Sequence, residues 1–378
     1  MKVLLITSPR LTGLNYHRQI VPFTNLDVDA SAYPVWDFTW TDEFLKDFEM
    51  VSFLRTISLE GKTNEILERV KKLGIKIHFD IDDYWVLPVN HTLYPNFKAQ
   101  DVSKQVVEAL KGADLVTTST KHLANVIKQH NENVYVLPNA IQPNEDQWQI
   151  VDNPNELMRF GYIAGVHHGA DVEILKPNFD KLWKDKGSYG KFQLAPAGFN
   201  LNTHEGVSSM NPYYHYVEQL FTDNYKHIKD SNYKEYLKSN SPIDNDMTFD
   251  RPYRRLWGLD TFNYGKIYNL IDVSLVPLQQ NLFTACKSEL KLIEAGFMKK
   301  AVIVSNVKPY DELANEFNSI LVNPNRNGID WYVAMRNLIK EPERVKDLGE
   351  AMYESVKVKH HIDTVNVERK QIFDNLCS

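Results

Sequence analysis

The sequence contains only two cysteines, Cys286 and Cys377, among its 378 residues. Two thiols do not make a disulfide framework of the kind that stabilises small secreted proteins. This scarcity favours a reducing, cytoplasmic compartment over secretion.

Long hydrophobic runs are also missing. A membrane-spanning helix needs about 20 consecutive, mostly apolar residues, and no stretch of this chain approaches that length. The apolar run at residues 3–6 is too short for a signal peptide, and Pro9 and Arg10 follow it in place of a small-residue cleavage site. We therefore interpret this run as a strand and expect any contact with a membrane to be peripheral.

The chain has no excess of positive charge. Lysine and arginine total 43 against 49 aspartates and glutamates, and the resulting net charge of -6 gives no overall attraction to nucleic acid or to an anionic membrane. A local basic groove stays open as an alternative. The 43% hydrophobic and 24% charged residues are those of an ordinary soluble globular protein. A chain of 378 residues exceeds one comfortable hydrophobic core, so we expect two domains.

Strand-like apolar segments alternate with amphipathic helical segments along both halves of the chain. This alternation predicts an α/β protein of two Rossmann-like domains, each with a parallel sheet covered on both faces. We predict an N-terminal domain at residues 1–150, a second domain at 156–350 and a C-terminal helix at 351–378, with a polar, proline-punctuated linker near residues 140–156. Strands are expected at residues 2–6, 50–54, 75–79, 114–118, 134–137, 157–163, 192–195, 273–277, 301–304 and 320–322.

An aromatic-rich insertion interrupts the second domain at about residues 200–257. Its tyrosines have two interpretations: packing against the domain, which is the commoner role of aromatic residues at helical spacing, or stacking on bases or sugars. Arg254 and Arg255, near the end of the insertion, are candidates to reach a phosphate of a bound donor.

Polar residues that suit a nucleotide follow one predicted strand of the second domain. After the strand at residues 273–277 come Lys287, Ser288, Lys291 and Glu294. Parallel sheets present their ligand crevice at the carboxyl ends of the strands. Lys291 and Glu294 share a helix face, and by itself such a pair is more often a solvated surface ion pair. Because apolar residues surround the pair, we expect the helix to pack on the sheet with its first turn open to the crevice.

This segment also carries a resemblance to a known family. The run Lys287-Ser-Glu-Leu-Lys291-Leu-Ile-Glu294-Ala-Gly296 resembles the K-S-x-x-K-x-x-E-A-G signature of the retaining "glycosyl transferases group 1" (family 4-like) enzymes. Residues 12–13, 80–83 and 160–171 are similar to other parts of that family. The resemblance covers nearly the whole chain and implies the GT-B fold, in which two Rossmann-like domains face each other across a cleft and the C-terminal helix crosses back to the first domain.

Donor-binding roles follow from the resemblance. It implies that Lys287, Ser288 and Lys291 hold the diphosphate of a nucleotide sugar and that Glu294 accepts hydrogen bonds from the ribose. Gly13 would let the first-domain loop approach the phosphate closely. One departure weakens the retaining assignment and the choice of donor sugar: Cys286 stands where many retaining members have a glutamate.

The loop of Gly165, His167 and His168 resembles the Gly-x-x-His-x-x-Asp donor loop of the same family. Donor contact through one of the histidines and an ordering role within the loop both stay open. Zinc ligation is the least favoured interpretation, because no cysteine or further ligand spacing supports it.

The candidate catalytic residues are Asp80, Asp82, Asp83 and His91. Three interpretations of the aspartates stay open: loop and cap chemistry, acceptor orientation or proton abstraction, and metal binding. The resemblance implies that a helix dipole and basic side chains replace the metal ion, so we expect no metal and no cofactor beyond the nucleotide-sugar co-substrate.

The predicted function is therefore a nucleotide-sugar-dependent glycosyltransferase, retaining and metal-independent. We expect a hydroxyl acceptor on a glycan, glycolipid or other glycoconjugate, with a modified nucleic-acid base as the less favoured acceptor. The alternatives are a nucleotide-sugar epimerase, another enzyme on the GT-B scaffold, or a non-catalytic nucleotide-binding protein.

Overall fold

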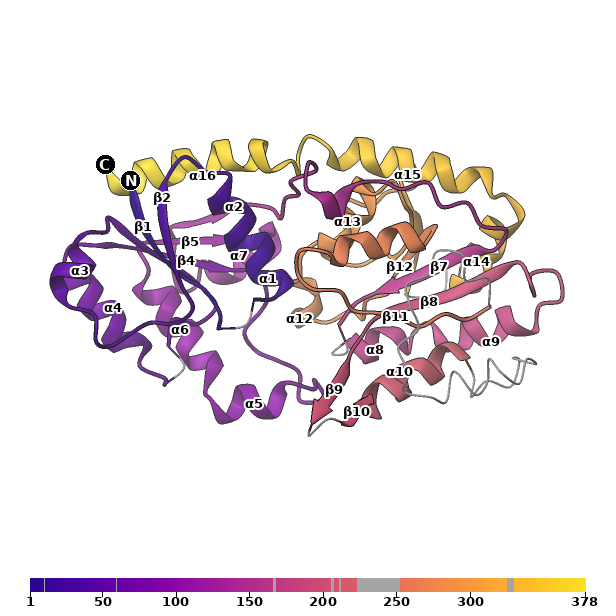
Figure 1. The fold of residues 1–378 in the computed structure, drawn as a ribbon, viewed down its shortest axis with the longest axis horizontal. Helices are drawn as coiled ribbons and strands as arrows, with labels where there is room; N and C mark the ends of the chain where they lie inside the picture. The colour runs from indigo at the N-terminus through magenta and orange to yellow at the C-terminus, as the bar shows by residue number, and fades with distance from the viewer. Residues whose placement is uncertain are drawn as a thin grey trace. The chain divides into compact units, whose positions relative to one another are not determined.

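The computed structural model describes residues 1–9, 11–58, 60–165, 168–204, 207–210, 212–222, 252–324 and 330–378, with the backbone alone for the described residues between 201 and 213. The chain divides into two compact units, each built from separate stretches of sequence (Figure 1). Unit 1 contains Met1–Gln142, Asn281–Leu290 and Val358–Ser378. Unit 2 contains Pro143–Gln280 and Lys291–Lys357.

Unit 1 is built on a six-stranded sheet with the order β2-β1-β3-β4-β5-β6, and every neighbouring pair is parallel. All five residues of β3 are buried, as expected for a parallel sheet covered on both faces. The strands are β1 (Lys2–Ile6), β2 (Asp29–Tyr33), β3 (Met50–Leu54), β4 (Lys76–Ile81), β5 (Leu115–Thr118) and β6 (Val134–Val136).

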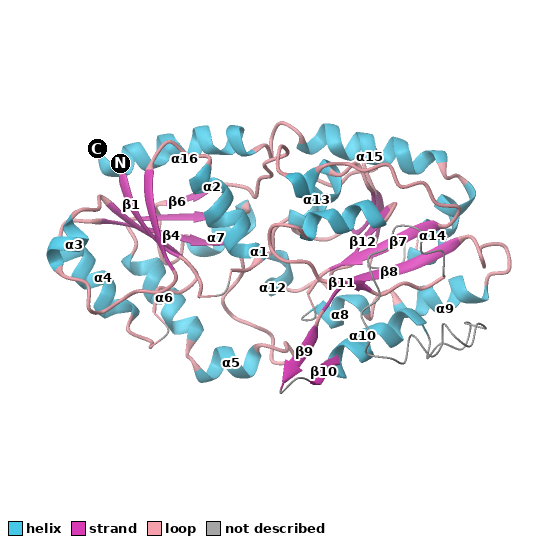
Figure 2. Cartoon of the chain, in the orientation of Figure 1, coloured by secondary structure: helices cyan, strands magenta, loops and turns pink. Residues whose placement is uncertain are grey.

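Helices lie on both faces of the unit 1 sheet (Figure 2). They include α1 (Gly13–Asn15), the π-helical turn η1 (Tyr16–Ile20), α2 (Val21–Thr24), α3 (Asp42–Lys46), α4 (Thr63–Lys72), α5 (Tyr94–Ala99), α6 (Val102–Gly112), α7 (Lys121–Ile127), α12 (Leu282–Ala285) and α16 (Ile362–Cys377). The C-terminal helix α16 belongs to this unit, since its Phe373 ring packs on His78 and on Phe23. The Asn366 amide of α16 also donates a 2.9 Å hydrogen bond to the Pro22 carbonyl.

Unit 2 contains a second six-stranded parallel sheet, with the order β11-β8-β7-β12-β13-β14. Its strands are β7 (Met158–Ile163), β8 (Phe192–Phe199), β11 (Leu256–Trp257), β12 (Val273–Val276), β13 (Ala301–Ser305) and β14 (Ile320–Val322). A separate antiparallel pair, β9 (Leu201–His204) and β10 (Val207–Met210), follows β8. The predicted fold class, two parallel-sheet α/β domains, is confirmed.

The unit 2 sheet is also covered on both faces (Figure 2). Its helices include α8 (Gly169–Val172), α9 (Lys176–Lys184), α10 (Pro212–Thr222), α13 (Leu290–Phe297), α14 (Trp331–Lys340), α15 (Glu343–Val356) and the 3-10 turns η2 (Asp146–Trp148), η5 (Tyr264–Leu270) and η6 (Tyr310–Glu312). Phe160, Phe179 and Phe221 are fully buried in the core that these elements enclose.

The observed division differs from the predicted one in three places. Residues 351–357, which we predicted as part of the C-terminal helix on the first domain, belong to unit 2. The chain enters unit 2 at Pro143, a few residues earlier than predicted, and residues 281–290 belong to unit 1 although we assigned them to the second domain. The strands β2, β9, β10 and β11 were not predicted. Most of the aromatic insertion, residues 223–251, lies outside the described residues. In its described part, Val217 and Leu220 of α10 are buried in the unit 2 core, as the packing interpretation expects.

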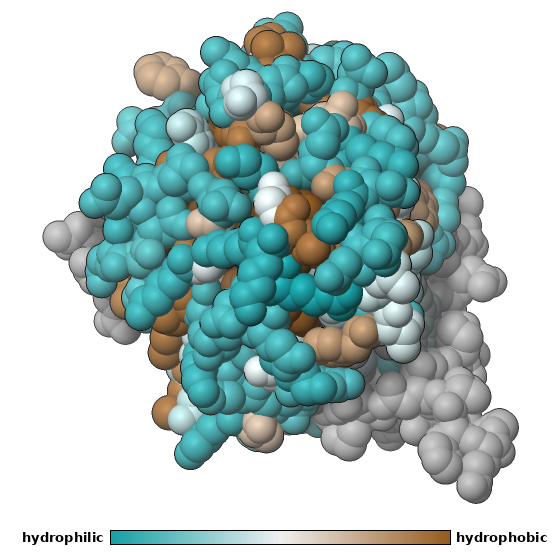
Figure 3. Space-filling model, turned by 90° about the vertical axis from the view of Figure 1, so that its left-hand side faces the viewer, coloured by the Kyte–Doolittle hydropathy of each residue, from teal (hydrophilic) through white to brown (hydrophobic). Residues whose placement is uncertain are grey.

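The surface offers few extended hydrophobic areas on the side that Figure 3 displays. That face of unit 1 is mostly hydrophilic, and its hydrophobic atoms appear in small, separate groups (Figure 3). Among the helices that the structure describes, none is long and apolar enough to cross a membrane.

Gly161, in the middle of β7, gives a test of the packing in unit 2. A Cβ atom at this position would lie 2.4 Å from Cγ2 of the fully buried Ile271. We expect Gly161→Ala to destabilise the protein by about 1–3 kcal/mol, because the buried neighbour has no space into which to move. Thermal unfolding measures the effect. Gly187→Ala is the control, since its Cβ would meet no atom closer than 3.4 Å; equal melting temperatures for the two variants would contradict the packing.

Candidate functional site

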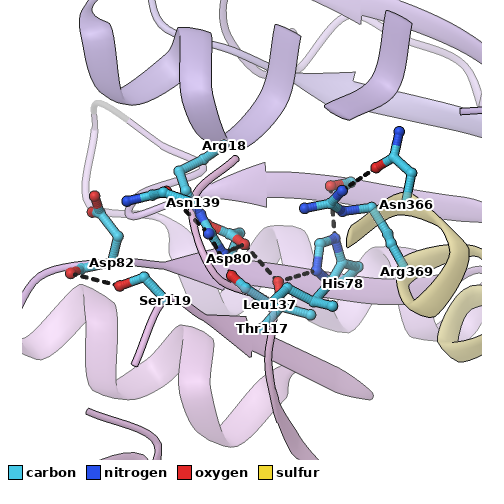
Figure 4. Close-up of polar contacts among 11 residues, drawn as sticks. Arg18, His78, Asp80, Asp82, Thr117, Ser119, Leu137, Asn139, Asn366 and Arg369 are labelled. Atoms are coloured by element: carbon cyan, nitrogen blue, oxygen red, sulfur yellow. Dashed lines mark hydrogen bonds and ion pairs between the residues drawn. The ribbon is translucent and has the colours of Figure 1, made fainter. Parts of the chain in front are cut away.

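A buried ion pair lies beneath the carboxyl edge of the unit 1 sheet (Figure 4). Arg18 donates from Nε and Nη2 to the two carboxylate oxygens of Asp80, at 2.9 and 2.7 Å. Thr117 Oγ1 donates to the same carboxylate, and Arg18 Nη1 reaches the Leu137 carbonyl at 2.6 Å. Burial alone would raise the pKa of Asp80, but the adjacent Arg18 guanidinium holds it below its usual value.

This geometry changes the interpretation of Asp80. Its carboxylate is 3% exposed, and both oxygens already accept hydrogen bonds from inside the unit. Of the interpretations left open for Asp80, these contacts favour loop chemistry over direct catalytic participation. Asp80 ties the turn η1, through Arg18, to the ends of β4 and β5.

Asp82 and Asp83 follow β4 and share a cation that the sequence did not reveal. Arg55 Nη2 lies 3.0 Å from Asp83 Oδ2 and 3.8 Å from Asp82 Oδ1. Arg55 comes directly after β3 and has a left-handed backbone with φ of 61°, a conformation that costs a non-glycine residue about 1–3 kcal/mol and clusters at functional sites. Figure 4 shows the Asp82 carboxylate pointing away from the Arg18–Asp80 pair, with the Ser119 hydroxyl near its backbone oxygen.

Asp82 has the electrostatics of a proton acceptor poised near neutrality. Its side chain is 12% exposed, and its Oδ1 atom is buried without a hydrogen-bond partner among the described residues. Burial, reinforced by the negative charge of Asp83, raises the pKa of Asp82 to about 7, although Arg55 and Arg18 oppose the shift. A carboxylate with this pKa can exchange a proton at physiological pH.

The segment of residues 281–290 brings part of the predicted signature to these aspartates, within unit 1. Lys287 Nζ lies 3.7 Å from Asp83 Oδ1 and 4.7 Å from the centre of the Phe283 ring. Cys286 is fully buried in the hydrophobic core of unit 1, and burial raises the pKa of its thiol to about 11. The residue that departs from the family pattern is therefore a core residue here. Ser288 is half-buried beside it.

His91 lies in the same neighbourhood but is engaged with its own loop. Its Nδ1 atom accepts a 3.1 Å hydrogen bond from the Leu93 amide, and its ring packs edge-on against Phe283 at 5.4 Å. These contacts support a role in ordering the loop between β4 and α5. A direct catalytic role for His91 stays a prediction.

In unit 2, a small pocket opens at the carboxyl edge of the sheet, after β7 and β8. It is lined by Tyr162, Ala164, Gly165, His168, Gly169, Val172, Pro196, Ala197, Phe199, Tyr214 and Val217. His168 Nδ1 lies 3.2 Å from Asp171 Oδ2, and the Gln279 amide donates to Asp171 Oδ1 at 2.9 Å. Although burial raises it, the pKa of Asp171 is held below its usual value by these hydrogen bonds. His167 lies outside the described residues.

Gly198 permits the close approach that shapes this pocket. Its φ is 100°, and a Cβ atom there would lie 2.3 Å from the Ala164 carbonyl oxygen. Only glycine adopts such a conformation readily and leaves room for the opposite loop. The ends of β7 and β8 are therefore held close together at the pocket.

Lys291 and Glu294 of the predicted signature belong to α13 in unit 2. Lys291 Nζ lies 5.1 Å from the centre of the Tyr162 ring, at the pocket wall, and its charge contributes to lowering the pKa of Asp171. Glu294 is 4% exposed and accepts hydrogen bonds from the Tyr264 and Tyr268 hydroxyls, the latter at 2.8 Å. These tyrosines, which the sequence did not point to, fix the Glu294 carboxylate in place.

The two arginines at the end of the insertion point inward. Arg254 and Arg255 are 1% and 0% exposed. The Arg255 guanidinium pairs with the buried Glu218 carboxylate through hydrogen bonds of 2.8 and 2.9 Å, and Tyr253 donates to the same carboxylate. Arg255 therefore has an internal partner, and the burial of both arginines disfavours the predicted contact with a donor phosphate.

Two predicted glycines lie next to open space. A Cβ atom built on Gly13 or on Gly165 would meet no described atom within 4 Å, and neither residue has a left-handed backbone. Neither local conformation nor packing among the described residues thus requires glycine at these positions. The predicted approach of a phosphate to these glycines stays a prediction.

Acidic and histidine side chains of the described residues form no group of three or more in position to hold a metal ion. Asp80, Asp82 and Asp83 are divided between Arg18 and Arg55.

Comparison with known proteins identifies solved structures that share this fold. No family model and no curated protein sequence matches this chain. Solved structures do match over its whole length. Anabaena Alr3699/HepE, crystallised with UDP and glucose, has a TM-score of 0.66 at 10% identity and covers 99% of both chains. Sucrose-phosphate synthase from Thermosynechococcus elongatus has a TM-score of 0.65 at 12% identity, covering 100% of this chain and 99% of its own.

A glycosyltransferase from Rickettsia africae ESF-5 is a third neighbour, with a TM-score of 0.59 at 11% identity and 99% and 98% coverage. The chain has the GT-B fold. At these identities the likeness concerns the fold alone, and the fold implied by the signature at residues 287–296 is thereby confirmed.

The raised pKa of Asp82 makes a prediction about stability. The folded protein keeps a proton on Asp82 up to about pH 7, whereas the unfolded chain releases it near pH 3.9. The free energy of unfolding therefore falls as the pH rises through this window. We expect Asp82→Asn to raise the melting temperature by several degrees at pH 8 and by clearly less at pH 5.

The exposed Asp27 provides the matched control for this experiment, since Asp27→Asn removes the same charge from the surface of unit 1. Thermal unfolding at both pH values compares the variants. A gain for Asp82→Asn that is equal at pH 5 and pH 8 would show that Asp82 is already ionised in the folded protein at pH 5.

Proposed function

We propose that this protein is a glycosyltransferase that moves a sugar from a nucleotide-diphosphate carrier to a hydroxyl acceptor. The observation that carries the proposal is the carboxyl edge of the unit 2 sheet in a GT-B fold, where Gly165 and His168 line a small pocket and Lys291 lies 5.1 Å from the ring of Tyr162, another lining residue. Ligands of open parallel sheets bind at this edge.

The donor is proposed to bind unit 2, with a uridine diphosphate sugar as the first candidate, because structures of the similar HepE protein contain UDP and UDP-glucose. In this proposal the Lys291 ammonium and the open space beside Gly165 receive the diphosphate. His168, oriented by Asp171, contacts the donor sugar or its phosphate.

Glu294 keeps its proposed role as an acceptor for the ribose hydroxyls. An ionised carboxylate has about four lone-pair sites, so the two tyrosine donors leave it further capacity. Tyr264 and Tyr268 then act as positioning residues, because they fix the orientation in which Glu294 would meet the ribose.

Catalysis in this proposal rests on placement and on stabilising the charge of the departing diphosphate, with no covalent nucleophile required. Lys291 supplies positive charge to that group. We propose a retaining, metal-independent reaction in which basic side chains do the work of a cation.

Unit 1 is proposed to bind the acceptor, with Asp82 as the group that receives or orients its hydroxyl. The half-buried carboxylate has an Oδ1 atom without a described hydrogen-bond partner, and its pKa of about 7 matches proton transfer at neutral pH. Arg55 and Lys287 hold the neighbouring Asp83 in place. A glycan or glycoconjugate is the proposed acceptor class.

Donor binding provides the first test of the proposal. We expect Lys291→Ala to weaken the affinity for UDP-glucose by about 1–3 kcal/mol, since a charged contact to the diphosphate is lost. Isothermal titration calorimetry with a panel of nucleotide sugars measures this, and Lys184→Ala on the exposed end of α9 is the control. Unchanged affinity in Lys291→Ala would refute the donor role, and nucleotide-sugar interconversion without nucleotide release would indicate an epimerase.

The acceptor role of Asp82 is tested separately from donor binding. We expect Asp82→Asn to lower the rate of sugar transfer by about 10²–10⁴-fold while the donor affinity stays that of the wild type, because Asp82 belongs to unit 1. Nucleotide release in the presence of acceptor measures the rate of sugar transfer, and a separate donor titration measures the donor affinity. Transfer at the wild-type rate would remove Asp82 from the reaction.

A further inference from the structure

A second, larger pocket lies at the opposite edge of the unit 2 sheet. Its volume is about 750 Å³, within the range of small-molecule sites. It is lined by residues that come immediately before strands or begin them: Met158 and Arg159 of β7, Lys191 before β8, Asp272 before β12, and Lys299 and Lys300 before β13. These positions mark the amino edge of the sheet, so this pocket is distinct from the one at Gly165 and His168.

The lining of this pocket carries a surplus of positive charge. Five cationic residues line it against three carboxylates: Arg159, Lys191, Lys299, Lys300 and Lys346, against Asp152, Glu156 and Asp272. One of the five cations, Lys299, is paired with Glu350 outside this lining, so one positive charge remains in surplus, opposite in sign to the charge of a phosphate.

One of the three carboxylates, Asp272, is already paired with Arg159. Asp272 accepts from Arg159 Nε at 2.9 Å and Nη2 at 2.6 Å, and from the Arg159 backbone amide at 2.8 Å. Arg159 itself is 3% exposed, and its Nη1 atom has no hydrogen-bond partner among the described residues. The pair therefore neutralises itself. Lys299 pairs with Glu350 at 3.0 Å, whereas Lys191, Lys300 and Lys346 have no ion-pair partner among the described residues.

Among these lysines, Lys300 gives the strongest indication of an anion site. It is half-buried, and no described carboxylate lies within ion-pair distance of its ammonium. Burial lowers the pKa of Lys300 to about 8, which the attraction of Asp272 only partly offsets. Removing a cation from water without a partner is costly, and an anion in the pocket would relieve that cost.

The remaining walls suit a ligand with both an anionic group and a carbon body. Helix α15 begins at Glu343, after Pro342 as N-cap, without a side-chain cap, and its first turn, which carries the acidic Glu343, meets the pocket next to Lys346. Ile150 and Val151, each 49% exposed, provide an apolar wall on the other side.

We propose that this pocket binds a phosphate-bearing small molecule, whose phosphate contacts Lys300, Lys346 and the start of α15. The site is separate from the proposed donor site, and the inference does not depend on the proposed function. The pocket lies within unit 2 and apart from the proposed donor site, which suits an effector instead of a substrate.

Phosphate binding to the full chain tests the proposal. Inorganic phosphate and glycerol phosphate serve as probes, with isothermal titration calorimetry as the readout. We expect Lys300→Met to raise the dissociation constant for phosphate at least tenfold, and Lys346→Met, on the exposed surface of α15, to raise it severalfold. Lys184→Met, which replaces a lysine of unit 2 outside the pocket, should bind phosphate as the wild type does.

One further variant distinguishes phosphate binding in this pocket from binding at the proposed donor site, because a site for a diphosphate can also bind phosphate. Lys291→Ala should retain the binding that Lys300→Met loses. The proposal is overturned if the wild type binds no phosphate at millimolar concentrations, if Lys300→Met binds it as tightly as the wild type, or if Lys291→Ala abolishes it. A melting curve of Lys300→Met without ligand verifies that the variant is folded.

The pH dependence gives an independent readout. Sulfate keeps its charge between pH 6 and pH 10, so a change in its affinity reports the protein. Because a bound anion favours charged Lys300, sulfate affinity should fall as the pH rises through about 8, well before an ordinary lysine loses its proton. The other charged groups around Lys300 are Arg159, Lys191, Lys299, Lys346, Asp152, Glu156, Asp272 and Glu350, which pairs with Lys299. Affinity that stays constant to pH 9.5 would contradict the role of Lys300.

Discussion

Parallel pairing of the strands is the constraint on which the rest of this structure depends. Each of the two six-stranded sheets is parallel throughout, so every strand must return through a covering segment before the next one begins. The loops that follow the strands therefore lie at one edge of each sheet, and the loops that precede the strands lie at the other edge. The carboxyl edges carry Asp82 and Arg55 in unit 1 and Gly165 and His168 in unit 2, whereas the amino edge of unit 2 collects the lysines of the second pocket.

Burial separates charged side chains that support the fold from those available to a ligand. Asp80 with Arg18, and Glu218 with Arg255, are enclosed and paired, and removing one partner of such a pair leaves an uncompensated buried charge. Asp82 differs, because its nearest cation lies 3.8 Å away and hydrogen-bonds to Asp83 instead. The same residue type thus serves as internal support at one position and keeps a carboxylate oxygen without a described hydrogen bond two residues later.

The sequence predicted the strands that read as continuous apolar runs, including β1, β3 and β12, because buried parallel strands need apolar residues on both faces. It missed β2, whose residues Asp29–Tyr33 are largely exposed and polar enough to read as a loop. It also pointed to Lys291 and Glu294 through a local signature. It gave no signal for Arg55, since a single arginine after a strand has no pattern that distinguishes it.

What the sequence determined by itself is the two-domain α/β architecture and the local signature at residues 287–296, because alternation and short motifs are properties of neighbouring residues. What only the tertiary structure decided is which side chains meet. The signature is divided, with Lys287 and buried Cys286 in unit 1 and Lys291 and Glu294 in unit 2. The partners that decide their chemistry, Asp83 for Lys287 and two tyrosines for Glu294, are distant in sequence, so only the folded chain brings them within hydrogen-bonding or ion-pair distance.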